Sequence, residues 1–404
     1  MTDLGQNTTD PKLFRPVCFL GNGSFSYVYL VRSHHEHDRD DSYALKRYFL
    51  RKPEVLLFAQ KEYRVLELLA LDFNKSPFLP TLYYSFTIDV SPTFVVEFET
   101  DITLSEIVTV RGGMRVERAR FYLTEVICAV RYLHDKEIVH MKLKPNNVLL
   151  TKSGHIKLID FDHSYNLFEN LGRRPTYIDF SVDNYFAAPE VVGKVAITKK
   201  ADIWSLGVLM ASLMDRSIRR GKRKDGTHLA KVGYWSIKRF SKLRTDLRNF
   251  FKAVFTLPYS RRPSIEEVQR HAFFQNVNWG AVESLAIKPP FSPLELESMA
   301  SRLWRGPHYN QSLVLDSIYN RCMPKMAKCR TISTRHDPDC DPVRIEPVTS
   351  KFRKIGCTFD DVTKALKEFN FIHPYLSYKR TLQEGKFTES YMESTSVENM
   401  DKVT

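Results

Sequence analysis

The first residues that could do chemistry are a glycine-containing loop, a lysine and a glutamate. Gly21 and Gly23 lie in a loop between two β-prone runs, where small residues would let backbone amides approach phosphate groups closely. A loop with two glycines is by itself more often an ordinary β-turn. Lys46 on the next β-prone run supplies a cation, and Glu62, on an apolar helical face, supplies its partner. Together they indicate a site for a phosphorylated ligand.

Four further motifs follow the lysine and the glutamate along the chain. They are HMKLKPNN at residues 140–147, DFD at 160–162, APE at 188–190 and DIWSLG at 202–207. The glycine loop, strand lysine, helix glutamate and these motifs come in the order found in protein kinases. Seven matching elements in one order are too many for chance.

The sequence resembles the AGC group of eukaryotic serine/threonine protein kinases. The segments that carry this resemblance are 77–86, 118–122, 154–157 and 271–291. The patch LKEFNF at 366–371 is similar to the C-terminal hydrophobic motif of the group, and Pro374, Lys379 and Arg380 resemble the ribosomal-protein and mitogen- and stress-activated kinases. The resemblance covers about residues 15–293 and then thins to that one patch.

This resemblance implies an α+β, two-lobed protein kinase fold. A small antiparallel β lobe with one helix would precede a larger, mainly helical lobe, and an AGC-type C-terminal tail would follow. The predicted division is a flexible N-terminus at 1–14, the N-lobe at 15–99, the C-lobe at 100–274, the C-terminal extension at 275–380 and a disordered tail at 381–404.

The resemblance also assigns a nucleotide site residue by residue, with ATP and magnesium as cofactors. The residues implied to bind ATP are Leu20, Gly21, Gly23, Val28, Ala44, Lys46, Glu62, Glu97 and Leu149. Asn147 and Asp160 would hold magnesium through hard oxygen ligands. The column that links the lobes in active kinases also has its counterparts, which are Leu66, Leu82, His140 and Phe161, with Asp202 as the anchor. The nucleotide-binding half is therefore intact.

Lys142 stands where phosphoryl transfer needs a carboxylate beside the substrate hydroxyl. An ammonium group has the opposite charge and cannot accept a proton at pH 7 unless it is strongly desolvated, and Lys144 adds positive charge close by. Losing a general base costs on the order of 10² to 10⁴ in rate. The sequence therefore predicts a pseudokinase.

Other departures fall in the same functional half, which carries out transfer and its switching. They are Met141 for an arginine that binds the activation-loop phosphate, Asp162 for a glycine, Asp179 for a phosphorylated threonine, Asp183 and Asn184 in the peptide-docking loop, Asn370 at the hydrophobic-motif phosphosite, and Thr103 for a ribose-binding glutamate. Asp162 would remove a permissive backbone position. Because Met141 replaces the arginine and Asp179 replaces the phosphorylated threonine, neither end of the phosphorylation switch remains.

Three functions stay open from the sequence. The first is an ATP-binding pseudokinase that acts as a signalling scaffold or an allosteric regulator of protein partners. The second is a divergent but active serine/threonine kinase that phosphorylates proteins. The third is a nuclear or nucleic-acid-associated protein that uses the basic run at 216–224, which otherwise would be a solvated loop. No aromatic residues are interleaved with that run, so nucleic acid is the least favoured partner.

The elements that must position these residues follow from local patterns. Short β-prone runs are expected at 16–20, 27–32, 43–49, 83–88 and 93–98, helices at 55–71, 117–134 and 202–214, and a hairpin at 148–159. The polar, histidine-rich stretch 33–42 predicts a solvated hairpin end. Pro289, Pro290 and Pro293 interrupt any helix after Phe274, which predicts an extended tail.

Composition places the protein among folded chains of an intracellular compartment. Of the 404 residues, 43% are hydrophobic and 26% charged, close to globular averages. No apolar stretch is long enough to span a bilayer, and six scattered cysteines signal neither a zinc site nor a disulfide framework. A net charge of +13 favours acidic or phosphate-rich partners. We expect a cytoplasmic or nuclear protein that does not bind membranes.

Overall fold

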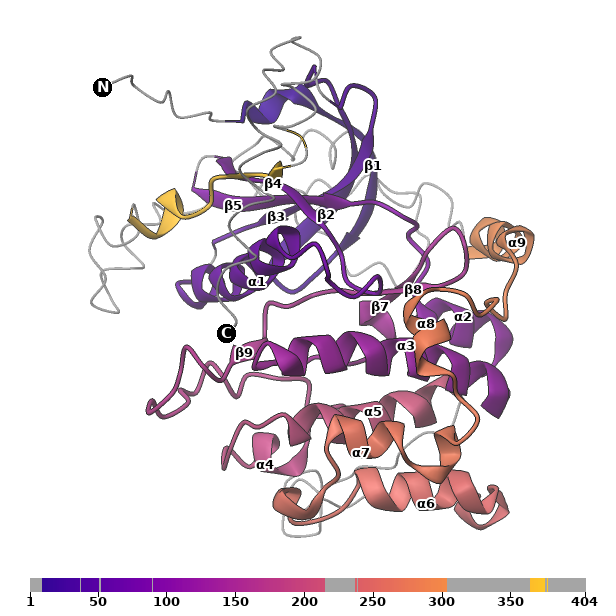
Figure 1. Cartoon of the computed structure of the whole chain (residues 1–404). Coiled ribbons are helices and arrows are strands. Elements are labelled where there is room, and N and C mark those ends of the chain that lie inside the picture. The colour runs from indigo at the N-terminus through magenta and orange to yellow at the C-terminus, as the bar shows by residue number, and fades with distance from the viewer. Residues whose placement is uncertain are drawn as a thin grey trace, which may run out of the picture.

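The computed structural model describes residues 9–36, 38–50, 52–88, 90–214, 237, 239–303, 364–374 and 376. In these ranges the chain forms a small lobe built on a β-sheet and a larger helical lobe (Figure 1), which confirms the predicted α+β, two-lobed architecture. None of the helices there is both long and apolar enough to cross a bilayer. The basic run at 216–224 and the predicted tail at 381–404 lie outside the described residues.

The small lobe is a six-stranded sheet in the order β1-β2-β3-β5-β4-β10, and each neighbouring pair is antiparallel. Its strands are β1 (Phe14–Asn22), β2 (Ser26–Ser33), β3 (Ser42–Tyr48), β4 (Leu82–Ile88), β5 (Ser91–Glu97) and β10 (Phe371–Ile372). In β2 the alternate residues Tyr27, Tyr29 and Val31 are buried, as expected for a strand with one face on a core. Strand β1 begins at the fully buried Phe14, just before the predicted boundary at residue 15.

Helix α1 (Glu54–Leu71) confirms the helix predicted at 55–71 and crosses one face of the sheet (Figure 1). Phe58, Leu66 and Leu69 are buried on its inner side because residues three and four apart share a helix face. Glu62 lies between Phe58 and Leu66 on that side and is only 4% exposed. The apolar spacing of the helix therefore brings a carboxylate into the interior.

The end of the β2–β3 hairpin is not the fully solvated loop that the sequence predicted. Asp38 is 1% exposed, and its carboxylate accepts hydrogen bonds from Ser33 Oγ at 2.7 Å, Tyr43 Oη at 2.8 Å and Tyr84 Oη at 2.7 Å. Burial and the charge of Asp38 raise the pKa of Tyr43, so this phenol remains a donor. Three hydroxyl donors from three strands make the buried charge tolerable.

The larger lobe is mainly helical and surrounds the buried helix α5. Its helices are α2 (Leu104–Arg111), α3 (Val116–Asp135), α4 (Pro189–Val192), α5 (Lys200–Leu213), α6 (Thr245–Val254), α7 (Ile265–Gln269), α8 (Trp279–Glu283) and α9 (Pro293–Leu303). The lobe also contains two short antiparallel ladders, which pair β6 (Ile138–Val139) with β9 (Tyr165–Asn166) and β7 (Val148–Leu150) with β8 (Ile156–Leu158). The β7–β8 pairing confirms the hairpin expected at 148–159.

Two helices after Phe274 correct the prediction of an extended tail. Helix α9 starts at Pro293, where a proline needs no hydrogen-bond partner for its nitrogen. Ser292 and Glu295 form reciprocal hydrogen bonds, because the Ser292 N–H donates to the Glu295 carboxylate at 2.9 Å and the Glu295 N–H donates to Ser292 Oγ at 3.3 Å. The proline that was expected to break a helix begins one.

The C-terminal patch folds back onto the small lobe, a question that the sequence left open. Strand β10 pairs with β4, and Phe371 lies opposite Ser85. Phe369 is 2% exposed and its ring lies 5.4 Å from that of Tyr63 on α1. Asn370, between the two phenylalanines, is exposed. The C-terminal patch therefore docks on the edge of the sheet and on α1. Asn370, which stands at the expected phosphosite of the hydrophobic motif, is uncharged.

The buried Asp38 carboxylate yields a stability prediction. Asp38→Ala leaves three buried hydroxyls without their acceptor, so we expect unfolding in urea to become easier by about 2 to 3 kcal/mol. Asp41→Ala, in the same loop but exposed, serves as the matched control and should change stability by less than about 0.5 kcal/mol. Equal losses in the two variants would contradict the proposed role of Asp38.

Candidate functional site

A cavity of about 940 Å³ lies between the lobes, and the chain brings all the predicted site residues to its wall. They are Leu20, Gly21, Gly23, Val28, Ala44, Lys46, Glu62, Glu97, Lys142, Lys144, Asn147, Leu149 and Asp160. Val96 and Ile159, which the sequence did not single out, add apolar lining. An apolar slot with a few convergent charges is the usual form of a small-molecule site.

The cation that the sequence predicted to bind phosphate, Lys46, lies on β3 in the cavity wall. Lys46 Nζ lies 2.6 Å from Glu62 Oε2 and 3.0 Å from Asp160 Oδ1. Burial alone would lower the pKa of Lys46, but the carboxylates of Asp160 and Glu62 more than offset it and raise that pKa. Tyr48 Oη also donates to Glu62. The lysine is therefore charged, and the glutamate orients it.

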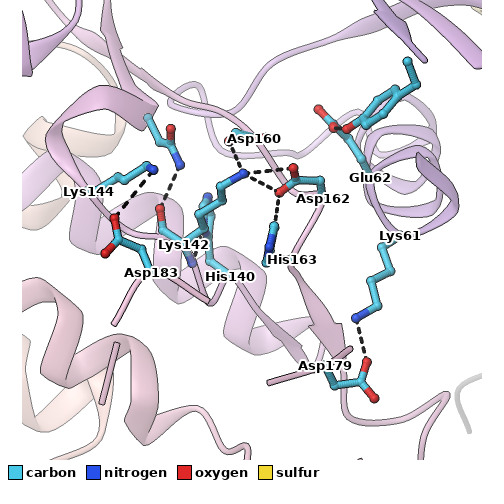
Figure 2. Close-up of polar contacts among 12 residues, drawn as sticks. Lys61, Glu62, His140, Lys142, Lys144, Asp160, Asp162, His163, Asp179 and Asp183 are labelled. Atoms are coloured by element: carbon cyan, nitrogen blue, oxygen red, sulfur yellow. Dashed lines mark hydrogen bonds and ion pairs between the residues drawn. The ribbon is translucent and has the colours of Figure 1, made fainter. Parts of the chain in front are cut away.

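Lys142 does not point into solvent but bridges two carboxylates (Figure 2). Its Nζ lies 2.7 Å from Asp160 Oδ2 and 2.7 and 2.9 Å from the two oxygens of Asp162. Burial acts to lower the pKa of Lys142, but the charges of Asp160 and Asp162 raise it above its usual value. The group keeps its proton and cannot serve as a general base.

Asp162 gains a role that the sequence did not reveal. It was interpreted there as the loss of a flexible glycine, whereas its carboxylate holds the Lys142 ammonium and accepts from His163 Nδ1 at 2.5 Å. Although burial and Asp160 act to raise the pKa of Asp162, His163 and Lys142 bring it below its usual value. The substitutions at 142 and 162 are thus complementary in charge.

The segment that carries Lys142 is fixed by backbone hydrogen bonds to Asp202 on α5. The Asp202 carboxylate, fully buried, accepts from the N–H groups of His140 at 2.8 Å and Met141 at 2.9 Å. Met141 has a φ of 64°, a strained value for a residue with a side chain. Asn147 Nδ2 donates to the carbonyl oxygen of Lys142 at 2.9 Å, which ties the loop to β7.

Two further departures, Thr103 in the cavity wall and Asp183 beside Lys144, also have local partners. Thr103 is the N-cap of α2, and its hydroxyl and N–H form a capping box with Glu106. Lys144 Nζ lies 3.9 Å from Asp183 Oδ2 (Figure 2). Glu106 lines the cavity too and was missed, although the spacing of a threonine and a glutamate three residues apart signals such a cap.

Asp179 pairs with helix α1 rather than standing alone. Its Oδ1 lies 2.6 Å from Lys61 Nζ (Figure 2), and its Oδ2 accepts from the N–H and hydroxyl of Thr176. Burial acts to raise the pKa of Asp179, but the hydrogen bond and charge of Lys61, together with the hydrogen bonds from Thr176, lower that pKa. One end of the expected switch is therefore replaced by a permanent ion pair.

Residues 14–274 match the family model of the protein kinase domain. The chain belongs to the protein kinase family. Over 296 residues it is 31% identical to ribosomal protein S6 kinase alpha-1 of Rattus norvegicus and of Homo sapiens, and over 297 residues it is 31% identical to ribosomal protein S6 kinase alpha-6 of Danio rerio. These matches cover 72% of this chain, which spans 39% of the length of the three relatives.

Protein kinase domains in general use ATP together with magnesium. The relatives carry the names of ribosomal S6 kinases, in agreement with the AGC resemblance. The family assignment accounts for the glycine loop, for Lys46 with Glu62 and for Asp202. It does not account for Lys142 and Asp162, which differ from the pattern expected of an active kinase.

The Lys61–Asp179 pair can be tested by a double-mutant cycle. With Lys61→Met and Asp179→Asn alone and together, we expect a coupling of about 1 kcal/mol in urea unfolding, because both side chains are largely shielded from solvent. Arg64 and Glu169 join the same two segments at 3.3 Å but are about half exposed, so their cycle should give less than about 0.5 kcal/mol. Equal couplings would show that the Lys61–Asp179 pair contributes no more than a surface contact.

Proposed function

We propose that this chain is an ATP-binding pseudokinase that acts on protein partners as a scaffold or an allosteric regulator. Its affinity for nucleotide would come from the glycine loop, the apolar slot and the Lys46–Glu62 pair, all of which line one cavity. Nucleotide binding would stabilise the closed arrangement of the lobes, and the partner would recognise that arrangement.

One observation carries the proposal. At the position where phosphoryl transfer needs a carboxylate, the Lys142 ammonium lies 2.7 Å from both Asp160 and Asp162. A group held in this way neither orients a substrate hydroxyl nor accepts its proton. The loss costs on the order of 10² to 10⁴ in rate, while the phosphate-binding lysine and its partner remain.

The alternative is a slow serine/threonine kinase that uses water or another carboxylate as the proton acceptor. The complete pair of Lys46 and Glu62, and the presence of Asn147 and Asp160 at the cavity wall, favour this second function. Both functions place ATP in the same cavity. They differ in whether the terminal phosphate of ATP is transferred to a protein substrate.

Protein partners and a cytoplasmic or nuclear location remain parts of the proposal. The C-terminal patch and the activation segment, which is the stretch between the DFD and APE motifs, give such partners accessible surface. In that segment Phe168 and Leu171 are more than 70% exposed. A role in nucleic-acid binding ranks last, because its only support is the charge of the run at 216–224.

Nucleotide binding is tested by thermal unfolding. At an ATP concentration near 100 times the dissociation constant, we expect stabilisation of about 2.7 kcal/mol, or a rise of several degrees in Tm. Lys46→Met should remove most of this rise, whereas Lys199→Met, whose ion pair with Glu137 lies outside the cavity, should leave it unchanged. No rise in the wild type at millimolar ATP, confirmed by calorimetry, would refute nucleotide binding.

Phosphoryl transfer is tested with labelled ATP and a basic peptide. We expect no transfer above that of Asp160→Asn. Lys142→Asp alone should stay inactive, because it puts three carboxylates together and removes the cation that joined Asp160 to Asp162. The double variant Lys142→Asp with Asp162→Gly removes this repulsion and should be the more active of the two. Wild-type transfer that Asp160→Asn abolishes would support the slow kinase instead.

A further inference from the structure

Of the two predicted magnesium ligands, the carboxylate Asp160 is already occupied by cationic side chains. Asp160 is bound through both oxygens, since Oδ1 lies 3.0 Å from Lys46 Nζ and Oδ2 lies 2.7 Å from Lys142 Nζ. Lys46 also contacts Glu62 of the small lobe, whereas Lys142 contacts Asp160 and Asp162 of the large lobe. The carboxylate that would have to coordinate the metal is therefore neutralised from two sides, once from each lobe.

A magnesium ion does not fit this arrangement. Mg²⁺ requires oxygen ligands at about 2.0 to 2.1 Å in octahedral geometry, and in nucleotide sites it usually takes one or two carboxylates and the phosphates. To reach Asp160 it would have to lie next to the Lys142 ammonium, which repels it, or displace that ammonium. Displacement is opposed because both oxygens of Asp162 also hold the lysine, at 2.7 and 2.9 Å.

We propose that the Lys142 ammonium takes the place of the divalent cation and that this site binds nucleotide without metal. The inference rests on the proposed nucleotide-binding function and specifies its ligand as the free, metal-less nucleoside triphosphate. Replacing a carboxylate by an ammonium at position 142 adds two units of positive charge, and Asp162 in place of a glycine takes one of them back, so the two substitutions together leave the site one unit more positive. Asp162 fixes the position of that charge, because it binds the amine of a long side chain that would otherwise reach solvent.

The cavity supplies further cations for a polyanionic ligand. Lys46, Lys142 and Lys144 all line it, together with the amides of the glycine loop. Free ATP carries more negative charge than its magnesium complex, so ammonium groups attract the free form more strongly. On this proposal the Lys142 ammonium supplies the positive charge that metal would otherwise bring, so metal adds no affinity.

The test compares ATP binding by calorimetry to the full-length protein in excess EDTA and in excess magnesium. We expect the dissociation constant in EDTA to be at most about threefold weaker than in magnesium. A weakening beyond that, with binding seen in magnesium, would overturn metal independence and leave the proposed nucleotide binding standing. Binding in neither condition would instead refute the nucleotide-binding function itself.

Lys142→Met then assigns the effect to the lysine. We expect it to weaken binding in EDTA by at least about tenfold and to restore it with magnesium, because Asp160 Oδ2 loses its ammonium partner. Lys199→Met, which removes an ion pair of the same length outside the cavity, should keep the wild-type ratio. A metal-independent Lys142→Met would overturn the role of Lys142. If that variant does not fold, the wild-type comparison still decides between metal-free and metal-dependent binding.

Discussion

The carboxylate of Asp160 is the constraint on which the site depends. One oxygen binds Lys46 from the small lobe and the other binds Lys142 from the large lobe, so a single side chain joins the two halves of the cavity. Buried charges are tolerated only when they are paired, and removing one partner leaves the other at high cost. Opening the lobes would separate Asp160 from Lys46. The closed arrangement is therefore maintained by charge as well as by apolar packing.

The unusual residues of this chain come in pairs of opposite charge. Lys142 at a carboxylate position is matched by Asp162 at a glycine position, and Asp179 at a phosphothreonine position is matched by Lys61. Each change alone would leave a poorly paired charge at a sheltered site, whereas together the changes give each charge a partner. On the proposed function, the arrangement would remove transfer chemistry while each charge keeps a partner. Paired substitutions of this kind differ from the unrelated substitutions expected at a site that has no remaining role.

The sequence predicted what local pattern and motif order determine, and it missed what only the folded chain brings together. Glu62 was placed correctly because helical spacing fixes its face. The pairing of Lys142 with Asp162 was missed because an intervening hairpin brings the two side chains together. Asp38 was missed because its donors come from separate strands. The spacing of Ser292 and Glu295, three residues apart, is typical of a helix cap. The cap was missed because the neighbouring prolines were interpreted as helix breakers.

Helix α1 explains how a kinase fold without its phosphorylation switch can keep a fixed conformation. Successive residues of a helix point about 100° apart, so four consecutive positions reach different parts of the molecule. The contacts are Gln60 with Glu368, Lys61 with Asp179, Glu62 with Lys46, and Tyr63 with Phe369. The tail, the activation segment and β3 therefore all hold the same turn of helix, and none of these contacts needs a phosphate. A partner that recognises this arrangement would find it already formed, in keeping with the proposed function of binding rather than transfer.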